Sequence, residues 1–288
     1  MPQRIWFDWE KIPADYPHLY DASDRKYRIY SESAKALVKL AHIKENECVL
    51  DVACGTGIST EQIFQRVKRK GKTVGIDVSE NMLQLARERF SHRGNVQFLQ
   101  FDALQLSQME ETFDVVLSNF GYWSLMSQAP LFFREASRVL SAKGRLIFNV
   151  TPFLREFALN GKTYNAFGRL YAGELERAMR RRGLPSAEDA SPNIQQSRIE
   201  SLLKRAGFQS VTFKPFQLPL TAQQAFDFMY ETFWRFGAKS YSGPLASLPP
   251  EERAKIFQEV VKRAKEELEK SKNTESPHIF NVLAKKEG

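Results

Sequence analysis

The stretch Asp51–Gly57, read as D-V-A-C-G-T-G, decides the fold expected for this chain. It closes the apolar run Cys48–Val52, which predicts a buried strand, and it leads into a segment with helical spacing, Thr60–Val67. Its glycines allow a sharp turn and a close approach of the backbone to a ligand, with amides free at the start of the helix. Taken alone, this G-x-G favours an ordinary strand-to-helix turn over a ligand site.

Strand and helix patterns alternate five times between Cys48 and Val150. Short apolar runs predict strands, and segments with apolar residues three and four positions apart predict helices. This rhythm is typical of a parallel sheet with right-handed crossovers and helices on both faces. The predicted strands are Cys48–Val52, Thr73–Ile76, Val96–Phe101, Phe113–Leu117 and Arg145–Val150, and the predicted helices are Ser31–Leu40, Thr60–Val67, Glu80–Phe90 and Leu131–Leu140.

Four of the predicted strands end in polar residues, namely Asp51, Asp77, Asp102 and the pair Ser118-Asn119. Ligands of parallel sheets bind outside the carboxyl ends of the strands. Asp77 lies 20 residues after Gly57, where a carboxylate can accept hydrogen bonds from a ribose diol. Asp102 lies at the next strand end, within reach of an adenine amino group. These two acids, added to the glycine turn, indicate an adenosyl-cofactor site.

Over roughly Tyr27–Thr151 the chain resembles the class I S-adenosylmethionine-dependent methyltransferases in the order and spacing of its motifs. The resemblance is greatest to the small-molecule branch that includes quinone-ring, malonyl-carrier-protein and glycine methyltransferases. The segments that carry it are Val49–Gly57 (motif I), Gly75–Leu83 (the ribose segment), Phe101–Ala103 (the adenine segment), Phe113–Phe120 (motif IV) and Glu135–Arg145 (the helix and turn before strand five).

The resemblance implies an α/β fold with a Rossmann-like, seven-stranded, mostly parallel sheet and a helical lid. The last strand, His278–Ala284, would be antiparallel. The enzyme would use S-adenosyl-L-methionine, with Asp77 on the ribose, Met82 on the adenine ring and Asp102-Ala103 at its edge. Asp51 and the backbone of Ala53–Gly57 would hold the methionine part. The full set of cofactor-binding residues expected in this way is Asp51, Ala53, Cys54, Gly55, Thr56, Gly57, Asp77, Val78, Met82, Asp102, Ala103, Asn119 and Phe120.

The pattern changes after Val150, and the chain divides into segments. We expect an N-terminal cap over residues 1–30 and the cofactor-binding core over 31–151. Residues 152–196 and 219–272 are predicted to form the helical lid, and 197–218 and 273–288 to return to the core sheet. The elements predicted after the core are the helices Thr163–Arg182, Ser197–Ala206, Ala222–Phe236 and Pro250–Lys270 and the strands Val211–Leu218 and His278–Ala284.

The lid segments are rich in aromatic residues, which we expect to shape a pocket for an apolar or aromatic small acceptor. Aromatic residues at helical spacing more often pack in a core than line a ligand site, so both roles stay open. Direct displacement needs an aligned nucleophile and in some cases a base, for which Tyr122 and His18 are the candidates. The residues expected to bind the acceptor are Tyr20, Tyr122, Trp123, Tyr164, Phe167, Phe233 and Trp234.

Composition narrows the other possibilities. The net charge of +8 permits nucleic acid as a partner, but the basic clusters Arg66–Lys72 and Arg180–Arg182 fall where helices are expected to end, which suits the helix dipole. Nucleic acid is therefore disfavoured. Cys48 and Cys54 form neither a disulfide framework nor a zinc signature, and no metal spacing occurs. No leader or apolar run of membrane-spanning length is present, so a cytoplasmic protein is expected.

Two other enzyme classes are disfavoured because this sequence lacks residues that their motifs require. A dinucleotide dehydrogenase prefers a third glycine where this chain has Thr60, and DNA amino-methyltransferases resemble one another in a proline pair that Ser118–Gly121 lacks. Two alternatives stay open. One is a methyltransferase-like nucleotide-binding protein without turnover, because the signal for a base is weak. The other is an RNA methyltransferase, which only the charge supports.

Overall fold

The computed structural model describes residues 8–151, 157–159, 162–164, 166–184, 195–234, 245, 247–271 and 276–287. The strands are β1 (Cys48–Val52), β2 (Lys72–Asp77), β3 (Val96–Gln100), β4 (Phe113–Ser118), β5 (Leu140–Val150), β6 (Phe157–Leu159), β7 (Lys162–Tyr164), β8 (Ser210–Gln217) and β9 (His278–Lys285). The α-helices are α1 (Tyr16–Tyr27), α2 (Ile29–Leu40), α3 (Ile58–Val67), α4 (Glu80–Arg89), α5 (Tyr122–Leu125), α6 (Ala129–Val139), α7 (Ala166–Arg180), α8 (Gln196–Arg205), α9 (Ala222–Met229) and α11 (Pro250–Ser271).

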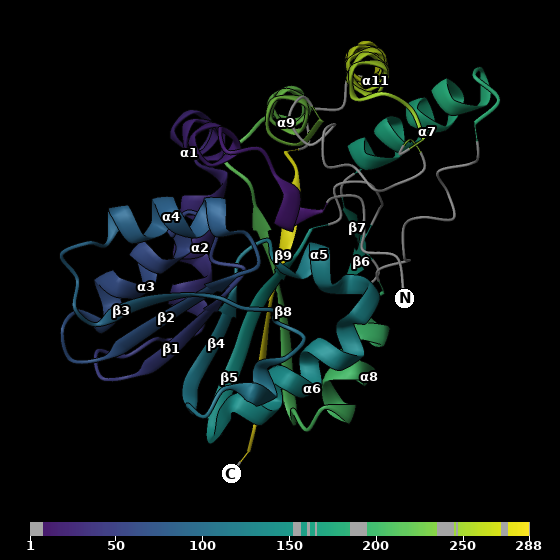
Figure 1. The fold of residues 1–288 in the computed structure, drawn as a ribbon. Helices are drawn as coiled ribbons and strands as arrows, with labels where there is room; N and C mark the ends of the chain where they lie inside the picture. The colour runs from purple at the N-terminus through teal and green to yellow at the C-terminus, as the bar shows by residue number, and fades with distance from the viewer. Residues whose placement is uncertain are drawn as a thin grey trace.

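Seven strands form one sheet in the order β3-β2-β1-β4-β5-β9-β8 (Figure 1). Strands β1 to β5 pair in parallel, whereas β9 runs antiparallel to both β5 and β8. This arrangement confirms the predicted seven-stranded sheet with an antiparallel last strand. The strand order reverses between β1 and β4, and ligands of such sheets bind in the crevice at this switch point.

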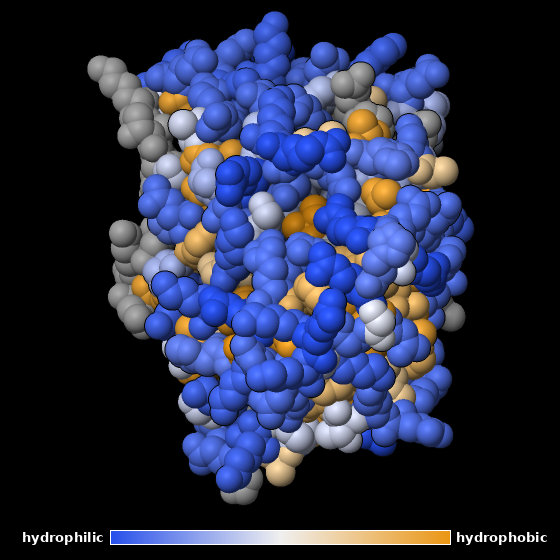
Figure 2. All heavy atoms as spheres, turned by 90° about the vertical axis from the view of Figure 1, so that its left-hand side faces the viewer, coloured by the Kyte–Doolittle hydropathy of each residue, from blue (hydrophilic) through white to orange (hydrophobic). Residues whose placement is uncertain are grey.

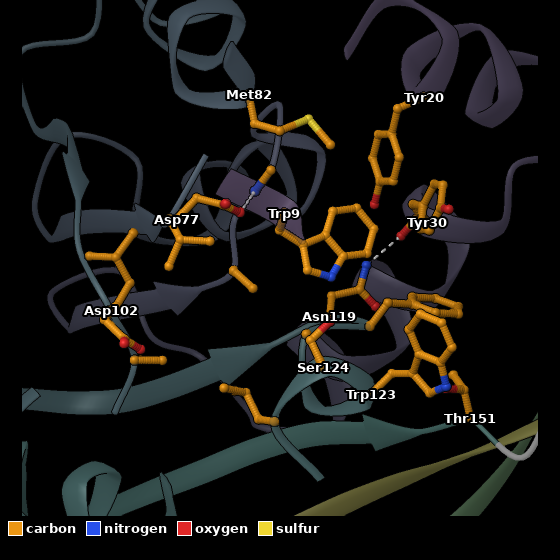
Figure 3. A pocket seen from close by; sticks show the side chains of 18 of the residues that line it. Trp9, Tyr20, Tyr30, Asp77, Met82, Asp102, Asn119, Trp123, Ser124 and Thr151 are labelled. Atoms are coloured by element: carbon orange, nitrogen blue, oxygen red, sulfur yellow. Dashed lines mark hydrogen bonds between the residues drawn. The ribbon is translucent and has the colours of Figure 1, made fainter. Parts of the chain in front are cut away.

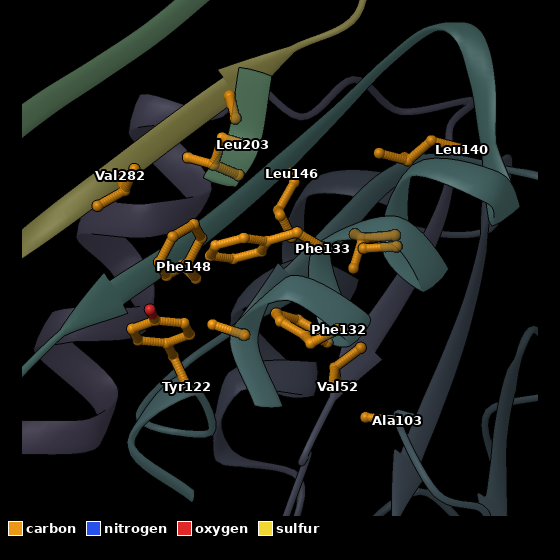
Figure 4. Packing of buried hydrophobic residues seen from close by; sticks show 14 of the residues in the cluster. Val52, Ala103, Tyr122, Phe132, Phe133, Leu140, Leu146, Phe148, Leu203 and Val282 are labelled. Atoms are coloured by element: carbon orange, nitrogen blue, oxygen red, sulfur yellow. The ribbon is translucent and has the colours of Figure 1, made fainter. Parts of the chain in front are cut away.

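Helices cover both faces of the sheet, which is why the central strands read as continuous apolar runs. Successive residues of β1 show this directly: Val49 packs with α2 and α3 on one face, and Leu50 packs with α6 and α8 on the other. Figure 4 shows the second face, where Phe132, Phe133 and Phe148 fill the space between the sheet and α6.

The side of the molecule beyond β3 and α4 is mostly hydrophilic (Figure 2). Charged residues on the outer face of α4 pair with one another, as Arg87 does with Glu80. The inner face of α4 packs Leu83 and Ala86 against Phe64 and Phe98. Among the described residues, no helix has the length and apolar character needed to cross a membrane.

A third layer lies across the top of the molecule in Figure 1, where α1, α9, α11 and α7 appear in a row. Their apolar faces share one cluster, in which Tyr171, Phe226 and Phe228 are fully buried. Tyr27 and Tyr30, at the end of α1 and the start of α2, join the same cluster. These aromatic residues therefore act as the core of the helical layer, which is the first of the two roles that the sequence left open.

Several elements differ from the sequence prediction: β6 and α5 were not predicted, and β5 begins at Leu140 instead of Arg145. The helix α1 was missed; its Tyr27 is followed by Arg28 in a left-handed conformation (φ 56°), which turns the chain directly into α2. The predicted helix Thr163–Arg182 begins only at Ala166, because Lys162–Tyr164 pairs with β6 as strand β7. The predicted helix Ala222–Phe236 is α-helical to Met229 and continues as a π-helical turn, η5, over Tyr230–Trp234.

An ion pair ties the start of β1 to β5, and its removal should destabilise the fold. The guanidinium of Arg145 donates to both carboxylate oxygens of Glu47 at 3.0 and 2.7 Å and also to the carbonyls of Ala41 and His42. Its side chain is 12% exposed and that of Glu47 is 11% exposed. We expect Arg145→Ala to lower the free energy of unfolding by about 3–5 kcal/mol in urea titrations, because Glu47 loses its partner.

The control for this prediction is the exposed pair Lys68–Glu45, with side chains 64% and 44% exposed. Lys68→Ala should cost less than about 1 kcal/mol, since water already screens that pair. Equal losses of unfolding free energy in Arg145→Ala and Lys68→Ala would contradict the stabilising role assigned to the buried Arg145–Glu47 pair.

Candidate active site

A cavity of about 1080 Å³, part of it open to solvent, lies at the carboxyl ends of β1 to β5. Each of the five strands contributes the residues that follow it, and the rest come from the N-terminal segment, α5 and α9. The lining residues are Trp9, Tyr20, Tyr30, Ala53, Gly55, Ile76, Asp77, Val78, Met82, Phe101, Asp102, Ala103, Asn119, Phe120, Gly121, Trp123, Ser124, Leu125, Thr151 and Met229.

The two glycines of the D-V-A-C-G-T-G turn have different surroundings, although both have positive φ (56° for Gly55 and 83° for Gly57). A Cβ added to Gly55 would meet only Tyr20 Cε1, at 4.0 Å, so the space above this residue is open to a ligand. A Cβ added to Gly57 would lie 3.1 Å from the ring of Phe90. Gly55 therefore faces the cavity, whereas Gly57 permits close packing between the turn and α4.

Two backbone amides of this turn, those of Gly55 and Gly57, are engaged by groups of the protein itself. The Gly55 N–H donates to Asp77 Oδ2 at 2.9 Å, and the Gly57 N–H donates to the Cys54 carbonyl at 3.0 Å. Asp77 Oδ1 accepts from the Ser79 N–H, also at 2.9 Å. Asp77 thus braces the glycine turn from the next strand. Burial raises the pKa of its carboxyl above the usual value, although the hydrogen bonds from these backbone N–H groups act in the opposite direction.

Asp51 lies beneath the cavity and does not line it. Its side chain is fully buried, and its Oδ2 accepts from the hydroxyls of Ser59 (2.8 Å) and Thr60 (2.7 Å). No described residue donates to its Oδ1, which is also buried. Burial raises the pKa of Asp51 to about 7, in spite of the two hydroxyl donors, and nearby Asp77 raises it further.

Nine of the thirteen residues expected to bind the cofactor line the cavity: Ala53, Gly55, Asp77, Val78, Met82, Asp102, Ala103, Asn119 and Phe120. The other four, Asp51, Cys54, Thr56 and Gly57, lie behind this lining. Thr56 is engaged elsewhere, since its hydroxyl donates to Asp21 Oδ1 of α1 at 2.5 Å. Direct binding by these four residues stays a prediction.

Tyr122 and His18, the candidates for a base, do not reach the cavity. Tyr122 is 4% exposed, and its ring stacks on Phe133 (centroids 5.6 Å apart) and packs on Phe148 (4.8 Å), as Figure 4 shows. Burial raises the pKa of its hydroxyl. The helix α5 begins directly after Gly121. Its first residue, Tyr122, points into the core, and the next, Trp123, lines the cavity. His18 is exposed on α1. The structure thus gives no support to either assignment, or to Tyr122 as an acceptor-binding residue.

Of the other residues expected to bind the acceptor, Tyr20 and Trp123 line the cavity. The side chains of Tyr164, Phe167, Phe233 and Trp234 lie outside the described part of the structure. The sequence prediction missed several lining residues. Thr151 could have been found, because it follows the fifth strand as Asp102 follows the third, and Ile76, Phe101 and Gly121 also lie near strand ends. The positions of the others depend on how the chain packs around the sheet; these are Trp9, Ser124, Leu125 and Met229.

The N-terminal segment forms one wall of the cavity. Tyr20 of α1 stacks on Tyr30 of α2 with ring centroids 4.1 Å apart, and Trp9 lines the same space (Figure 3). Asp21 holds α1 to the core, since it accepts from Thr56 and pairs with Arg89. Three aromatic rings next to an open glycine turn suit a cofactor that carries a positive charge and a flat base.

Because the pKa of Asp51 is raised, this residue should change how the free energy of unfolding depends on pH. A carboxyl whose pKa is higher in the folded than in the unfolded protein stabilises the fold at low pH, and this contribution is lost as the pH rises through the folded value. Between about pH 4 and pH 7 the free energy of unfolding should therefore fall for the wild type relative to Asp51→Asn, with a slope of up to about 1.4 kcal/mol per pH unit.

The measurement is urea unfolding of the two proteins without cofactor across this pH range. Glu110→Gln, at an exposed position, is the matched control and should leave the slope as in the wild type. Parallel curves for wild type and Asp51→Asn would refute the elevated pKa.

Comparison with known proteins agrees with this geometry. A methyltransferase-domain family matches residues 49–144. The ubiquinone/menaquinone biosynthesis C-methyltransferase of Azotobacter vinelandii is 32% identical over 183 residues, which cover 61% of this chain and 71% of the relative. The enzyme of the same name from Pseudomonas fluorescens is 30% identical over 218 residues, covering 71% and 81%. The demethylmenaquinone methyltransferase of Staphylococcus haemolyticus is 28% identical, covering 63% and 77%.

Solved structures share the fold at low identity. A phosphoethanolamine N-methyltransferase of Haemonchus contortus in complex with S-adenosyl-L-methionine aligns with a TM-score of 0.56 and 17% identity, over 95% of this chain and 57% of that longer one. A putative sarcosine dimethylglycine methyltransferase from Galdieria sulphuraria aligns with a TM-score of 0.54 and 12% identity, over 94% and 98%. By its motifs, its sheet and its bacterial relatives, the chain belongs to the class I S-adenosylmethionine-dependent methyltransferases.

Proposed function

We propose that this methyltransferase transfers the methyl group to an uncharged aromatic ring of the quinone type. The observation that carries the proposal is the charge of the cavity. Asp77 and Asp102 are the only charged residues among the described lining, and no lysine, arginine or histidine is present in it. A phosphate or carboxylate on the acceptor would therefore find no cation among these described residues to compensate its desolvation.

The cavity has two chemically different ends (Figure 3). Asp77 and Asp102 lie at one end, where we propose that they bind the ribose and the adenine of the cofactor, with Met82 packing on the base. Trp123 and Thr151 lie at the other end, beyond Asn119. We assign this second end to the acceptor, because Trp123 offers a flat, apolar contact there.

The relatives named above are C-methyltransferases of ubiquinone and menaquinone biosynthesis. S-adenosylmethionine supplies an electrophilic methyl group, so the acceptor must bring electron density to the reacting carbon. A reduced, dihydroxy form of a quinone ring does so through its own hydroxyl groups, which fits a cavity without histidine or lysine among its described lining residues. The side chains then have three tasks, which are to bind, to align the two reactants and to exclude water.

The experiment is a transfer assay with methyl-labelled S-adenosylmethionine and four separate acceptors: reduced demethylmenaquinone, phosphoethanolamine, sarcosine and bulk transfer RNA. We expect label on a ring carbon of the quinol and none in the other three. Transfer to phosphoethanolamine or RNA with none to the quinol would contradict the proposal. Binding of S-adenosylhomocysteine in calorimetry with no transfer to any acceptor would instead support a nucleotide-binding protein without turnover.

The proposed ribose contact of Asp77 has a separate test. Asp77→Ala removes the acceptor for the ribose hydroxyls and the brace of the Gly55 turn, so affinity for S-adenosylhomocysteine should fall by about 1.5–3 kcal/mol, roughly ten- to a hundredfold. Isothermal calorimetry measures the affinity, and circular dichroism at the same temperature shows that the variant is folded. Glu110→Ala, at an exposed site, should bind as the wild type does. Unchanged affinity of a folded Asp77→Ala protein would refute the assignment.

A further inference from the structure

A buried polar network connects α2, the end of β4 and β5 behind the cavity. Its side chains are Ser33, Asn119 and Asn149, of which Ser33 is fully buried and Asn149 is 1% exposed. Asn119 is 6% exposed and lines the cavity, whereas the other two do not. The three side chains contact one another within 2.8–2.9 Å.

Two backbone groups, the Phe120 N–H and the Tyr30 carbonyl, determine which end of each asparagine side chain donates and which accepts. The Phe120 N–H can only donate, and it donates to Asn149 Oδ1 at 2.8 Å. The amide nitrogen of Asn149 must therefore face the other way, where it donates to Asn119 Oδ1 (2.8 Å) and to Ser33 Oγ (2.9 Å). Both hydrogens of this nitrogen are used, so the orientation of Asn149 is fully determined.

The orientation of Asn119 follows from that of Asn149. Its Oδ1 accepts from Asn149 and from the Ser33 hydroxyl at 2.8 Å, which fills both of its lone pairs. Its amide nitrogen then faces the Tyr30 carbonyl, an obligatory acceptor, and donates to it at 3.0 Å (Figure 3). An amide flip at Asn119 would put oxygen against the Tyr30 carbonyl, and a flip at Asn149 would put nitrogen against the Phe120 N–H.

One N–H of Asn119 has no partner in this network. The Asn119 amide nitrogen carries two hydrogens, and only the one given to Tyr30 has a partner among the described residues. All other polar atoms of Asn119 and Asn149 are satisfied within the network. Asn119 lines the cavity next to Phe120, so a ligand there is the partner that we consider for the remaining N–H.

We infer that Asn119 is a specificity-determining donor, which binds an oxygen of the ligand at the junction between the two ends of the cavity. Asn149 and Ser33 are positioning residues that keep its N–H, and not its oxygen, directed there. The oxygen belongs either to the carboxylate of the cofactor or to a hydroxyl or carbonyl of the acceptor. The second source rests on the proposed function, whereas the first does not.

The decisive variant is Asn149→Asp, which keeps the shape but removes the donor. The new carboxylate faces Asn119 Oδ1, whereas a flipped Asn119 would face its oxygen to the Tyr30 carbonyl, so neither orientation holds the Asn119 N–H in its present place. Affinity for a ligand oxygen at that place should then fall about tenfold or more. Calorimetry with S-adenosylhomocysteine tests the cofactor, and the KM for reduced demethylmenaquinone tests the acceptor. A loss in either arm supports the inference and names the source of the oxygen.

Ser33→Ala is the matched control. It removes two hydrogen bonds of the same buried network but leaves Asn149 to hold Asn119 in its present orientation. We expect this variant to lose stability in urea titrations and to bind both ligands within threefold of the wild type. An equal loss of affinity in Ser33→Ala and Asn149→Asp would overturn the inference, because the effect would then follow stability and not polarity. Unchanged affinity in a folded Asn149→Asp would overturn it as well.

A measurement on the wild-type protein covers the case in which Asn149→Asp does not fold. In a 15N-labelled sample, the side-chain amide signals of Asn119 are identified by their absence from Asn119→Ser. Donation to a ligand oxygen should move one of the two amide proton signals downfield when S-adenosylhomocysteine or the quinol is added. If both signals stay in place under saturation with each ligand, the inference is refuted.

Discussion

The parallel pairing of β1 with β2 on one side and with β4 on the other is the constraint on which the site depends. It brings the carboxyl ends of successive strands to one edge of the sheet, so that residues far apart in the chain meet there. Asp77 at the end of β2 can accept from the Gly55 N–H only because the register places Asp51 beside Gly75. The brace between the two strand ends then holds the open face of the glycine turn toward the cavity.

The turn after β4 is locked to the turn after β1 in the same way. The Ser118 hydroxyl donates to the Val52 carbonyl at 3.1 Å, and a Cβ on Gly121 would lie only 2.7 Å from the Cβ of Ala53. Ala53 and Phe120, which both line the cavity, have positive φ values of 56° and 61°. Such conformations cost of order 1 kcal/mol or more in a residue with a side chain, and the surrounding hydrogen bonds must offset that cost.

The helical layer completes the site from outside the sheet. Its aromatic residues pack mainly on one another, and the cavity receives Met229 from α9 and Tyr20 from α1. Contacts between α1 and the turn η5 of the same layer include the hydroxyls of Ser23 and Thr232, 2.6 Å apart, and the pair of Lys26 with Glu231. α1 is therefore held both to the core, through Asp21, and to the rest of the helical layer.

The sequence by itself determined the sheet, the cofactor class and the acids Asp77 and Asp102. These features follow from local patterns: apolar runs, glycines at strand ends and the spacing of acids, each of which acts within a few residues of its own position. It also indicated Asn119 and Phe120 through a motif. Asp51 was part of the same motif, yet only the structure shows it beneath the cavity and not in its lining, because one step along a strand reverses the face of the side chain.

Tertiary structure alone decided the rest. Tyr122 and Trp123 are neighbours in sequence with similar chemistry, and only the direction in which α5 starts sends one ring into the core and the other to the cavity. Trp9 and Met229 reach the cavity because the segment before α1 and the helix α9 fold over the sheet edge, which no local pattern encodes. The polarity of Asn119 depends on Ser33 and Asn149, 86 and 30 residues away, because a hydrogen-bond network is defined by its partners in space.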